Sequence, residues 1–326
     1  MFSYRHAFHA GNHADALKHL TLLAVLQRLM RKSAPLTLID THAGAGLYRL
    51  DSTAARTAGE AGHGIARLET LYRARFSSLN LAETHITHGH DATNQEADPV
   101  SDYLAQVASF NAAAPWRIYP GSPFLMYAAM SEPARAAVHD RLKLFELHPA
   151  DSQALQAHVA QLQAGRQISV ARQDGFEGLK GLLPPPPGSA GSRRALVLID
   201  PSYEIKSDYA KVAAAVEDSL RRFATGVYLV WHPIIARPQA HDLPRRLRTL
   251  ARQAGRPWLH ATLSVGSPQS TTLPATQPPP LRASGMFVIN PPHTLAPALQ
   301  TALPVLQHAL ARGPHAGWTV EAGEGK

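Results

Sequence analysis

Short apolar runs, several of them ending at an acidic residue, recur along the chain. The first is Leu36–Ile39, followed by Asp40, and another is Ala195–Ile199, followed by Asp200. Continuous runs of branched and small apolar residues are typical of strands buried on both faces of a parallel sheet. We expect further strands at 142–146, 166–174, 226–231, 258–265 and 286–290.

Other segments repeat their apolar residues at helical spacing. A helix beginning at Asn12 or His13 is predicted by Leu17, Leu20, Leu23, Leu26 and Leu29, and it should pack under the sheet. Residues 208–223 and 243–254 predict two more helices. Alternation of strands and helices indicates a parallel sheet, so we expect an α/β fold. One domain spanning 1–326 suffices for a chain of this length.

The α/β pattern is interrupted between residues 50 and 115. About 100 residues separate Gly46 from Glu146, which is far more than a strand-helix-strand unit needs. Apolar residues recur at helical spacing from Ile65 to Phe76 and from Tyr103 to Phe110. We therefore predict a small inserted helical subdomain.

The junction Asp200-Pro201-Ser202-Tyr203 carries the strongest chemical signal. Ligands of open α/β sheets bind beyond the carboxyl ends of the strands. The exocyclic amine of adenine has two N–H donors, which the Asp200 carboxylate and the Pro201 carbonyl can both accept, while Tyr203 can stack on the extruded base. The alternative is an acidic strand end followed by a turn, because Asp, Pro and Ser all favour turns.

A second strand end, Asp40-Thr-His-Ala-Gly44-Ala-Gly46, suggests a cofactor crevice. Gly44 and Gly46 allow a sharp backbone bend and the close approach of a ligand. A dinucleotide fingerprint would need a third glycine where Arg49 stands, which disfavours a nicotinamide enzyme. An acid before the glycines, with another strand-terminal acid for a ribose, is the arrangement of S-adenosylmethionine sites.

Two further strand ends complete this prediction. Glu146 is placed to accept hydrogen bonds from both ribose hydroxyls, and Asp174 with Gly175 is placed for the adenine amine of the cofactor. Each acid can instead be a helix cap, and Asp174 is the strongest candidate for that role.

Taken together, the motifs resemble the RlmJ family of 23S rRNA adenine-N6-methyltransferases over nearly the whole chain. The resemblance implies a class I, Rossmann-like methyltransferase sheet of seven strands with one strand reversed. It also implies that Asp200 is the catalytic acceptor and that Tyr4 touches the RNA. The segments that carry it are Tyr4–Asp15 with Lys18 and His19, Asp40–Gly46, Tyr119–Pro123, Glu146–Pro149, Asp174–Phe176 and Ala283–Met286. By resemblance, the cofactor contacts are His19, His42, Ser122, Glu146, Asp174 and Gly175.

One residue departs from the family pattern, and one segment imitates it. The family has Asp-Pro-Pro-Tyr at the active strand, whereas this chain has Ser202 in the third place, where a second proline would stiffen the turn. The segment Asn290-Pro-Pro-His293 resembles another form of the amine-binding motif but has no aromatic residue in fourth place. We interpret it as a strand-to-helix stop.

The helix that begins near His13 raises two further questions. Lys18 is a candidate contact for the methionine carboxylate of the cofactor, with a surface lysine as the equal alternative. His9 and His13 have the spacing of zinc ligands on a helix, but no His-Glu-x-x-His signature accompanies them, so we expect no metal.

Charge and composition limit the possible partners and location of the protein. The net charge of +8 favours a polyanionic partner such as nucleic acid, although the excess of arginine also fits a genome-wide bias. The absence of cysteine excludes a thiolate nucleophile. No apolar run approaches the roughly 20 residues needed to span a bilayer, and the start lacks a signal peptide's apolar segment, so a cytoplasmic monomer is expected.

The leading hypothesis is direct, S-adenosylmethionine-dependent methylation of an adenine N6 in 23S rRNA, free of ribosomal proteins. The nearest rival is a DNA adenine N6-methyltransferase, because the same residues hold the amine in either nucleic acid. Ser202 prompts a third hypothesis, a catalytically weakened RNA-binding or ribosome-assembly factor. A nicotinamide oxidoreductase is a distant fourth.

Overall fold

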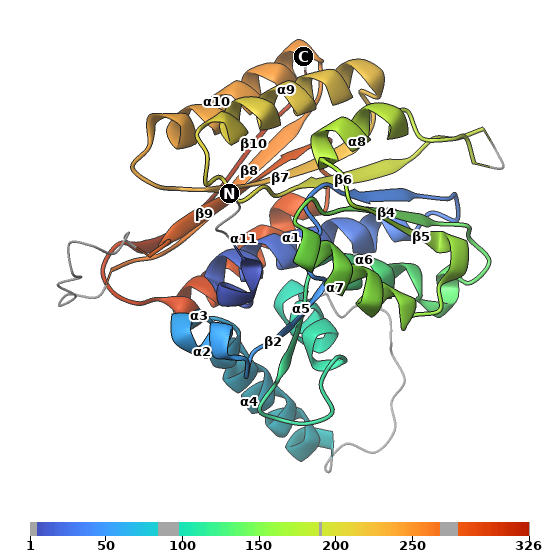
Figure 1. Cartoon of the computed structure of the whole chain (residues 1–326). Helices are drawn as coiled ribbons and strands as arrows, with labels where there is room; N and C mark the ends of the chain where they lie inside the picture. Colours follow the sequence, from blue (N-terminus) through green and yellow to red (C-terminus); the bar gives the residue numbers. More distant parts are fainter. Residues whose placement is uncertain (1–4, 84–97, 189–190, 268–279, 326) are drawn as a thin grey trace.

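An eight-stranded sheet forms the centre of the protein. The computed structural model describes residues 5–83, 98–188, 191–267 and 280–325, and in this part of the chain the strand order is β10-β8-β9-β7-β6-β1-β4-β5. Helices cover both faces of the sheet (Figure 1), so the predicted α/β fold is confirmed. The strands are β1 (Thr37–Asp40), β4 (Arg141–Phe145), β5 (Ile168–Ala171), β6 (Ala195–Ile199), β7 (Val227–Pro233), β8 (Trp258–Val265), β9 (Ala283–Ile289) and β10 (Ala316–Gly323).

Strands β5, β4, β1, β6 and β7 are parallel, so their carboxyl ends meet at one edge of the sheet. Strand β9 is reversed, as expected, and pairs antiparallel with both β7 and β8. The expected number of seven strands is wrong, because β10 pairs antiparallel with β8 and adds an eighth. As an edge strand, β10 has no fully buried residue, and its sequence therefore lacks a clear apolar pattern.

Two apolar cores lie on the two faces of the sheet. One core includes residues of α1 (His13–Met30), α6 (Ser122–Met130), α7 (Pro149–Ala160) and α11 (Leu295–Leu310). The other includes residues of α8 (Gly175–Leu182), α9 (Ser207–Arg222) and α10 (Pro238–Gln253). The predicted helices at 208–223 and 243–254 correspond to α9 and to the second part of α10. Short 3₁₀ turns lie at η1 (His6–Phe8), η2 (Pro133–Arg135) and η3 (Gly165–Gln167).

Helix α1 begins where it was predicted to begin. The Asn12 side chain caps it by accepting hydrogen bonds from the backbone N–H groups of Ala14 and Asp15. Every residue from His13 to Leu26 is buried, because the helix lies between the sheet and helices α5, α6 and α11. Lys18 is only 5% exposed, so its interpretation as a surface lysine is wrong.

The region between residues 50 and 115 is largely helical. It lies between β2 (Leu47–Arg49) and β3 (Ile118–Pro120), two short strands that pair antiparallel in a small sheet of their own. The helices between them are α2 (Thr53–Ala58), α3 (Glu60–His63), α4 (Ile65–Glu83) and α5 (Pro99–Ala108). The helices predicted from Ile65 and from Tyr103 are α4 and α5, and both contact α11. Within the described ranges, no helix has the length and apolar character needed to cross a bilayer.

A buried ion pair connects the end of α1 with the starts of β1 and β4. The Arg135 guanidinium lies 2.5 Å from an Asp140 carboxylate oxygen, with the two side chains 2% and 1% exposed. Asp140 also accepts the backbone N–H of Leu36 before β1, and Arg135 donates to the Met30 carbonyl at the end of α1. The pair thus fixes where α1, β1 and β4 begin or end.

Replacing Arg135 with Met should lower the free energy of unfolding by about 3–5 kcal/mol, because Asp140 would keep a buried charge without its partner. Urea denaturation followed by circular dichroism measures the change. The exposed neighbour Arg141 provides a control, since Arg141→Ala should change stability by less than about 0.5 kcal/mol. Equal stabilities of the two variants would contradict the structural role of the pair.

Candidate active site

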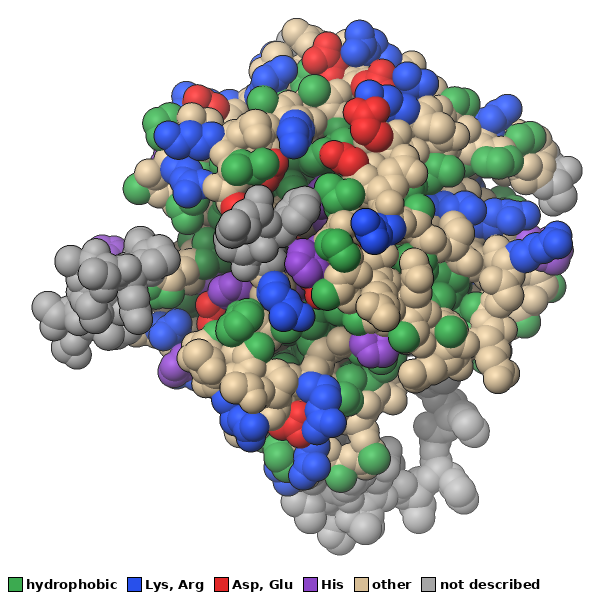
Figure 2. All heavy atoms as spheres, viewed as in Figure 1, with side chains coloured by type: hydrophobic (Ala, Val, Ile, Leu, Met, Phe, Trp, Pro, Cys, Tyr) green, Lys and Arg blue, Asp and Glu red, His purple; other side chains and the backbone are tan. Residues whose placement is uncertain are grey.

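The carboxyl ends of the parallel strands open into a cavity of about 690 Å³. This volume lies in the range of about 300–1,000 Å³ typical of small-molecule sites. The cavity also reaches the amino-terminal turns of α1 and the chain after β6. In the space-filling view, histidine side chains gather around a hollow on this face (Figure 2).

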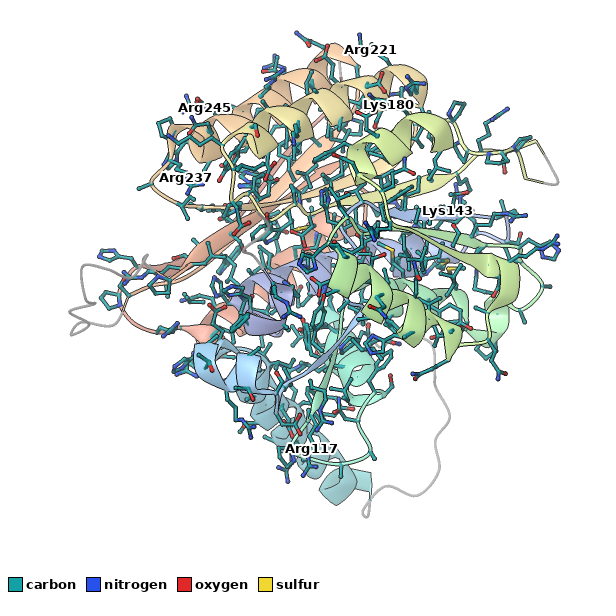
Figure 3. The ribbon with its side chains drawn as sticks, in the orientation of Figure 1. Arg117, Lys143, Lys180, Arg221, Arg237 and Arg245 are labelled. Atoms are coloured by element: carbon teal, nitrogen blue, oxygen red, sulfur yellow. The ribbon has the colours of Figure 1, made fainter. Side chains whose placement is uncertain are left out.

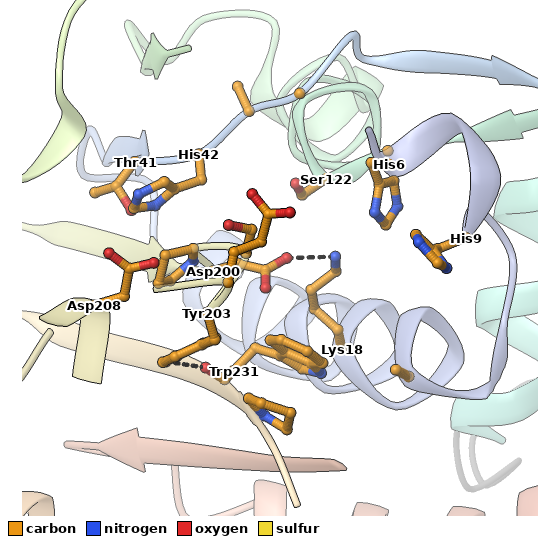
Figure 4. Close-up of a pocket in the computed structure, with 18 of the residues that line it drawn as sticks. His6, His9, Lys18, Thr41, His42, Ser122, Asp200, Tyr203, Asp208 and Trp231 are labelled. Carbon is orange, nitrogen blue, oxygen red and sulfur yellow. Dashed lines mark hydrogen bonds and ion pairs between the residues drawn. The ribbon is translucent and has the colours of Figure 1, made fainter. Parts of the chain in front are cut away.

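Asp200 lies at the floor of this cavity, directly after the fully buried strand β6. Its side chain is 15% exposed, and its Oδ2 lies 2.5 Å from the Nζ of Lys18 on α1 (Figure 4). Burial raises the pKa of Asp200, while the Lys18 charge opposes that rise. The Lys18 ammonium thus compensates the negative charge of Asp200, the carboxylate predicted to accept a hydrogen bond from the adenine amine.

Asp15 holds Lys18 from the other side. Its buried carboxylate lies 2.9 Å from Lys18 Nζ and 3.0 Å from His6 Nε2, and it accepts the Gly11 N–H. Burial acts to lower the pKa of Lys18, but Asp15 and Asp200 together raise it well above its ordinary value. Lys18 is therefore a charged bridge between two carboxylates. This role of Asp15 could not be predicted from the sequence, because an acid in the first turn of a helix usually only complements the helix dipole.

Tyr203 is built into the wall of the cavity. It is 2% exposed, and its hydroxyl donates to the Trp231 carbonyl at 2.7 Å. Its φ of 54° is in the left-handed region, and Arg237 donates to its carbonyl oxygen at 3.1 Å. These contacts fix the turn that follows Asp200. Stacking of Tyr203 on a base remains a prediction.

The glycine turn after β1 has the predicted bend. Gly44 and Gly46 have φ values of 60° and 81°, which side chains rarely adopt. A Cβ atom on Gly44 would lie 2.1 Å from the Tyr48 hydroxyl oxygen. The Gly44 N–H donates to Glu146 Oε2 at 2.8 Å, which links the turn to the end of β4. Burial raises the pKa of Glu146.

Asp174 is the amino-terminal cap of α8, as its alternative interpretation predicted. Its side chain accepts the Phe176 N–H at 2.8 Å, and it also lines the cavity. The neighbouring His42 packs edge-on against Phe176 with ring centroids 4.9 Å apart, and burial lowers the His42 pKa to about 4. Gly175 approaches β1 so closely that a Cβ would lie 2.0 Å from the Thr41 carbonyl oxygen.

Ser122 and His19 contribute from α6 and α1. The Ser122 hydroxyl donates to Asp40 Oδ2 at 2.6 Å, and burial raises the pKa of Asp40 to about 6. His19 is held by Tyr119 through its Nδ1 atom at 2.8 Å, and burial lowers its pKa to about 3. Its Nε2 atom is buried without a hydrogen-bond partner. A polar ligand in the cavity could form the hydrogen bond that this buried atom lacks.

Tyr4 is the one predicted site residue that lies outside the described residues. All the others line the one cavity. They are Lys18, His19, His42, Gly44, Ser122, Glu146, Asp174, Gly175, Asp200, Pro201 and Tyr203.

Asn290 does not belong to the site. It follows β9, which runs opposite to β6 and β7, and so it lies at the other edge of the sheet. Its side-chain amide donates to the carbonyls of Ala224 and Gly226 before β7. The structure agrees with a stop between β9 and α11.

The sequence has arginine clusters at Arg193-Arg194, Arg221-Arg222 and Arg245–Arg248, and several of these side chains make structural contacts. Arg194 donates to two backbone carbonyls, and Arg222 pairs with Asp218 on α9. Figure 3 shows Arg221 and Arg245 on the outer helices α9 and α10, whereas Arg237 lies at the start of α10 and lines the cavity. In the part of the chain that the structure describes, no group of three His, Cys, Asp or Glu side chains is arranged to hold a metal ion.

Comparison with known proteins decides the family. A family model described as ribosomal RNA large subunit methyltransferase D, RlmJ, matches residues 33–75 and 83–322. The ribosomal RNA large subunit methyltransferase J of Escherichia coli K12 is 37% identical over 310 residues, which cover 95% of this chain and 94% of that protein. The chain belongs to the RlmJ family.

Two further comparisons agree. The RlmJ relative from Haemophilus influenzae is 35% identical over 322 residues, which cover 98% of each protein. A crystal structure of a Legionella pneumophila protein is 26% identical, with a TM-score of 0.74, and covers 97% of this chain and 98% of that one. The resemblance noted from the sequence motifs is thereby confirmed, and the RlmJ fold of this chain has a solved counterpart.

Asp40 should make the stability of this RlmJ-family protein depend on pH. Its pKa in the folded state, about 6, is above the ordinary 3.8, so the folded state binds the proton more tightly. The stabilisation from protonation is therefore present below about pH 4 and is lost as pH rises through about 6. Asp40→Asn removes the ionisation. The variant should gain on the order of 2–3 kcal/mol relative to the unmodified protein between pH 4 and pH 7. Urea unfolding across this range tests it, and a constant difference would refute it.

Proposed function

We propose that the protein transfers a methyl group from S-adenosylmethionine to the N6 atom of an adenine in 23S rRNA. The observation that carries the proposal is the buried Asp200 carboxylate at the floor of the cavity, followed by Pro201 and the anchored Tyr203. RlmJ family membership supports methyl transfer to large-subunit ribosomal RNA. The family names favour RNA over the DNA substrate of the rival hypothesis.

The residues present fit S-adenosylmethionine. Glu146 accepts the N–H groups of Gly44 and His148 and still has lone pairs for two ribose hydroxyls. The cap Asp174 uses one oxygen for Phe176, which leaves the other for an adenine amine. The orphaned His19 Nε2 offers a further polar contact. When bound, this cofactor supplies an electrophilic methyl group.

Asp200 and Pro201 position the attacking amine. The lone pair of an aryl amine is delocalised into the ring, so hydrogen bonds that favour a pyramidal nitrogen raise its reactivity. Lys18 contacts Oδ2 of Asp200, so Oδ1 can accept one N–H while the Pro201 carbonyl accepts the other. Lys18 keeps the carboxylate ionised before the amine binds.

The same carboxylate can remove the surplus proton. Attack by a neutral amine leaves N6 with a positive charge and one proton too many. Burial raises the pKa of Asp200, which makes it a better proton acceptor than an exposed aspartate. Lys18 and Asp15 carry opposite charges, so once Asp200 has taken the proton the three side chains have no net charge.

Ser202 does not disturb this arrangement. It is exposed, whereas the residues on either side, Pro201 and Tyr203, are buried. The contacts of Tyr203 with Trp231 and Arg237 hold the turn without a second proline. This geometry favours an active enzyme over a weakened binding factor.

Calorimetry with S-adenosylmethionine tests the cofactor site. Glu146→Gln should weaken binding about tenfold or more, because hydrogen bonds to a charged acceptor are worth about 1.5–3 kcal/mol. Glu177→Gln provides a matched control with unchanged affinity, because Glu177 is exposed and pairs with Lys180. Preferential binding of NAD would overturn the cofactor assignment.

The reaction itself is tested with labelled S-adenosylmethionine and protein-free 23S rRNA, with the label located by nucleoside mass spectrometry. We expect N6-methyladenosine, and Asp200→Ala should reduce its formation by about a hundredfold or more. Asp218→Ala, on the outer face of α9, should retain full activity. Undiminished transfer by the Asp200 variant would remove Asp200 from the mechanism, and no transfer by the unmodified protein would refute the substrate.

A further inference from the structure

A large apolar side chain is presented to solvent at the mouth of the cavity. Among the described residues, the exposed large hydrophobic side chains are Phe8 at 37%, Leu147 at 42% and Ile205 at 57%. Leu147 and Ile205 both line the cavity. Leu147 directly follows Glu146 at the end of β4, on the side proposed for the cofactor. Ile205 lies on the other side, five residues after Asp200.

The segment that carries Ile205 is held at both ends. Tyr203 is fixed by its hydroxyl on the Trp231 carbonyl and by Arg237 on its own carbonyl. After it, the Ile205 carbonyl accepts the Asp208 N–H at 3.0 Å as α9 begins. Ile205 therefore projects from a constrained turn. An isoleucine exposed in this way contributes little to folding, and its fixed place at a ligand cavity suggests a contact with the ligand.

Cationic side chains surround this position. Lys206, directly before α9, and Lys211, near the start of α9, are both exposed, and Lys211 and Arg237 line the cavity with Ile205. Arg237, labelled at the start of α10 in Figure 3, donates to the Tyr203 carbonyl of this turn. Glu204 and Asp208 are the acidic groups of the same segment, and Lys211 lies 3.9 Å from Asp208. An apolar tip with flanking cations matches a nucleic-acid strand, which offers base faces between phosphates.

We propose that Ile205 is the wedge that takes the place of the target adenine in the RNA stack, while Lys206 and Lys211 face the flanking phosphates. The inference rests on the proposed function. An adenine whose N6 reaches Asp200 at the cavity floor must leave its stack, and unstacking costs free energy. Proteins that unstack bases commonly insert Ile, Leu, Met or Phe to cover the exposed neighbour. Ile205 is placed at the mouth that the adenine would pass.

Extrusion is measured separately from chemistry by 2-aminopurine fluorescence. A folded 23S rRNA fragment carries 2-aminopurine at the adenine that the labelling experiment identifies, and S-adenosylhomocysteine fills the cofactor site. The unmodified protein should raise the fluorescence as the base leaves the stack. Ile205→Ala should reduce this rise about fivefold or more, whereas Ile205→Leu should retain it, because leucine keeps an apolar tip.

The methylation rate gives an independent readout. For Ile205→Ala, kcat/KM on the folded fragment should fall about tenfold, but on a short single strand, whose adenine is already unstacked, it should change by less than about threefold. Ile205→Lys separates base extrusion from electrostatic attraction to RNA, because it removes the apolar tip and adds a positive charge. This variant should bind RNA at least as tightly as the unmodified protein and yet fail to extrude the base. Unchanged melting temperatures exclude misfolding of the variants.

Several results would overturn the wedge. These are full fluorescence and full activity of Ile205→Ala on folded RNA, equal losses on folded and single-stranded RNA, or weakened S-adenosylmethionine binding with normal extrusion. The wedge would also be overturned if the unmodified protein methylated the RNA but caused no change in fluorescence. If the unmodified protein methylates no RNA, the proposed function itself fails. The assay with labelled S-adenosylmethionine distinguishes that case from failure of the wedge alone.

Discussion

The site depends on one buried chain of charges, in which Lys18 lies between the carboxylates of Asp15 and Asp200. A buried ammonium group is costly unless it is paired, and here the two carboxylates supply the pairing. This chain connects α1 to the end of β6. The position of the Asp200 carboxylate is thus set by a helix as well as by its own strand, and any movement of α1 would change the position of Asp200.

Strand direction explains why one Pro-containing strand end is a site and another is not. Asp40 ends β1, while Glu146 and Asp200 follow the parallel strands β4 and β6, so all three converge on one edge of the sheet. Asn290 follows the reversed strand β9 and lies at the opposite edge, where its amide closes a backbone turn. Motif letters alone do not distinguish these cases. The direction of the preceding strand decides which polar side chains can act together.

Much of the fold and the site could be predicted from the sequence, for identifiable reasons. The strands before Asp40, Glu146 and Asp200 are buried, so their apolar runs are distinct, and the cap Asn12 marks the start of α1. Strand β10 could not be predicted, because an edge strand needs few buried residues. The burial of Lys18 and the anchoring of Tyr203 depend on contacts with Asp200 and Trp231, which are distant in sequence. No local sequence pattern predicts contacts between residues so far apart in the chain.

The burial of α1 also has a consequence for how the enzyme is made. This helix, close to the start of the sequence, packs against β9 and α11, which come almost at its end. Contacts of such long sequence separation form late in folding, because a long loop must close first. While the ribosome is still synthesising the chain, the apolar sides of α1 that β9 and α11 will cover have no partner. The packing of the helix that carries Lys18 is therefore completed only once β9 and α11 have been synthesised.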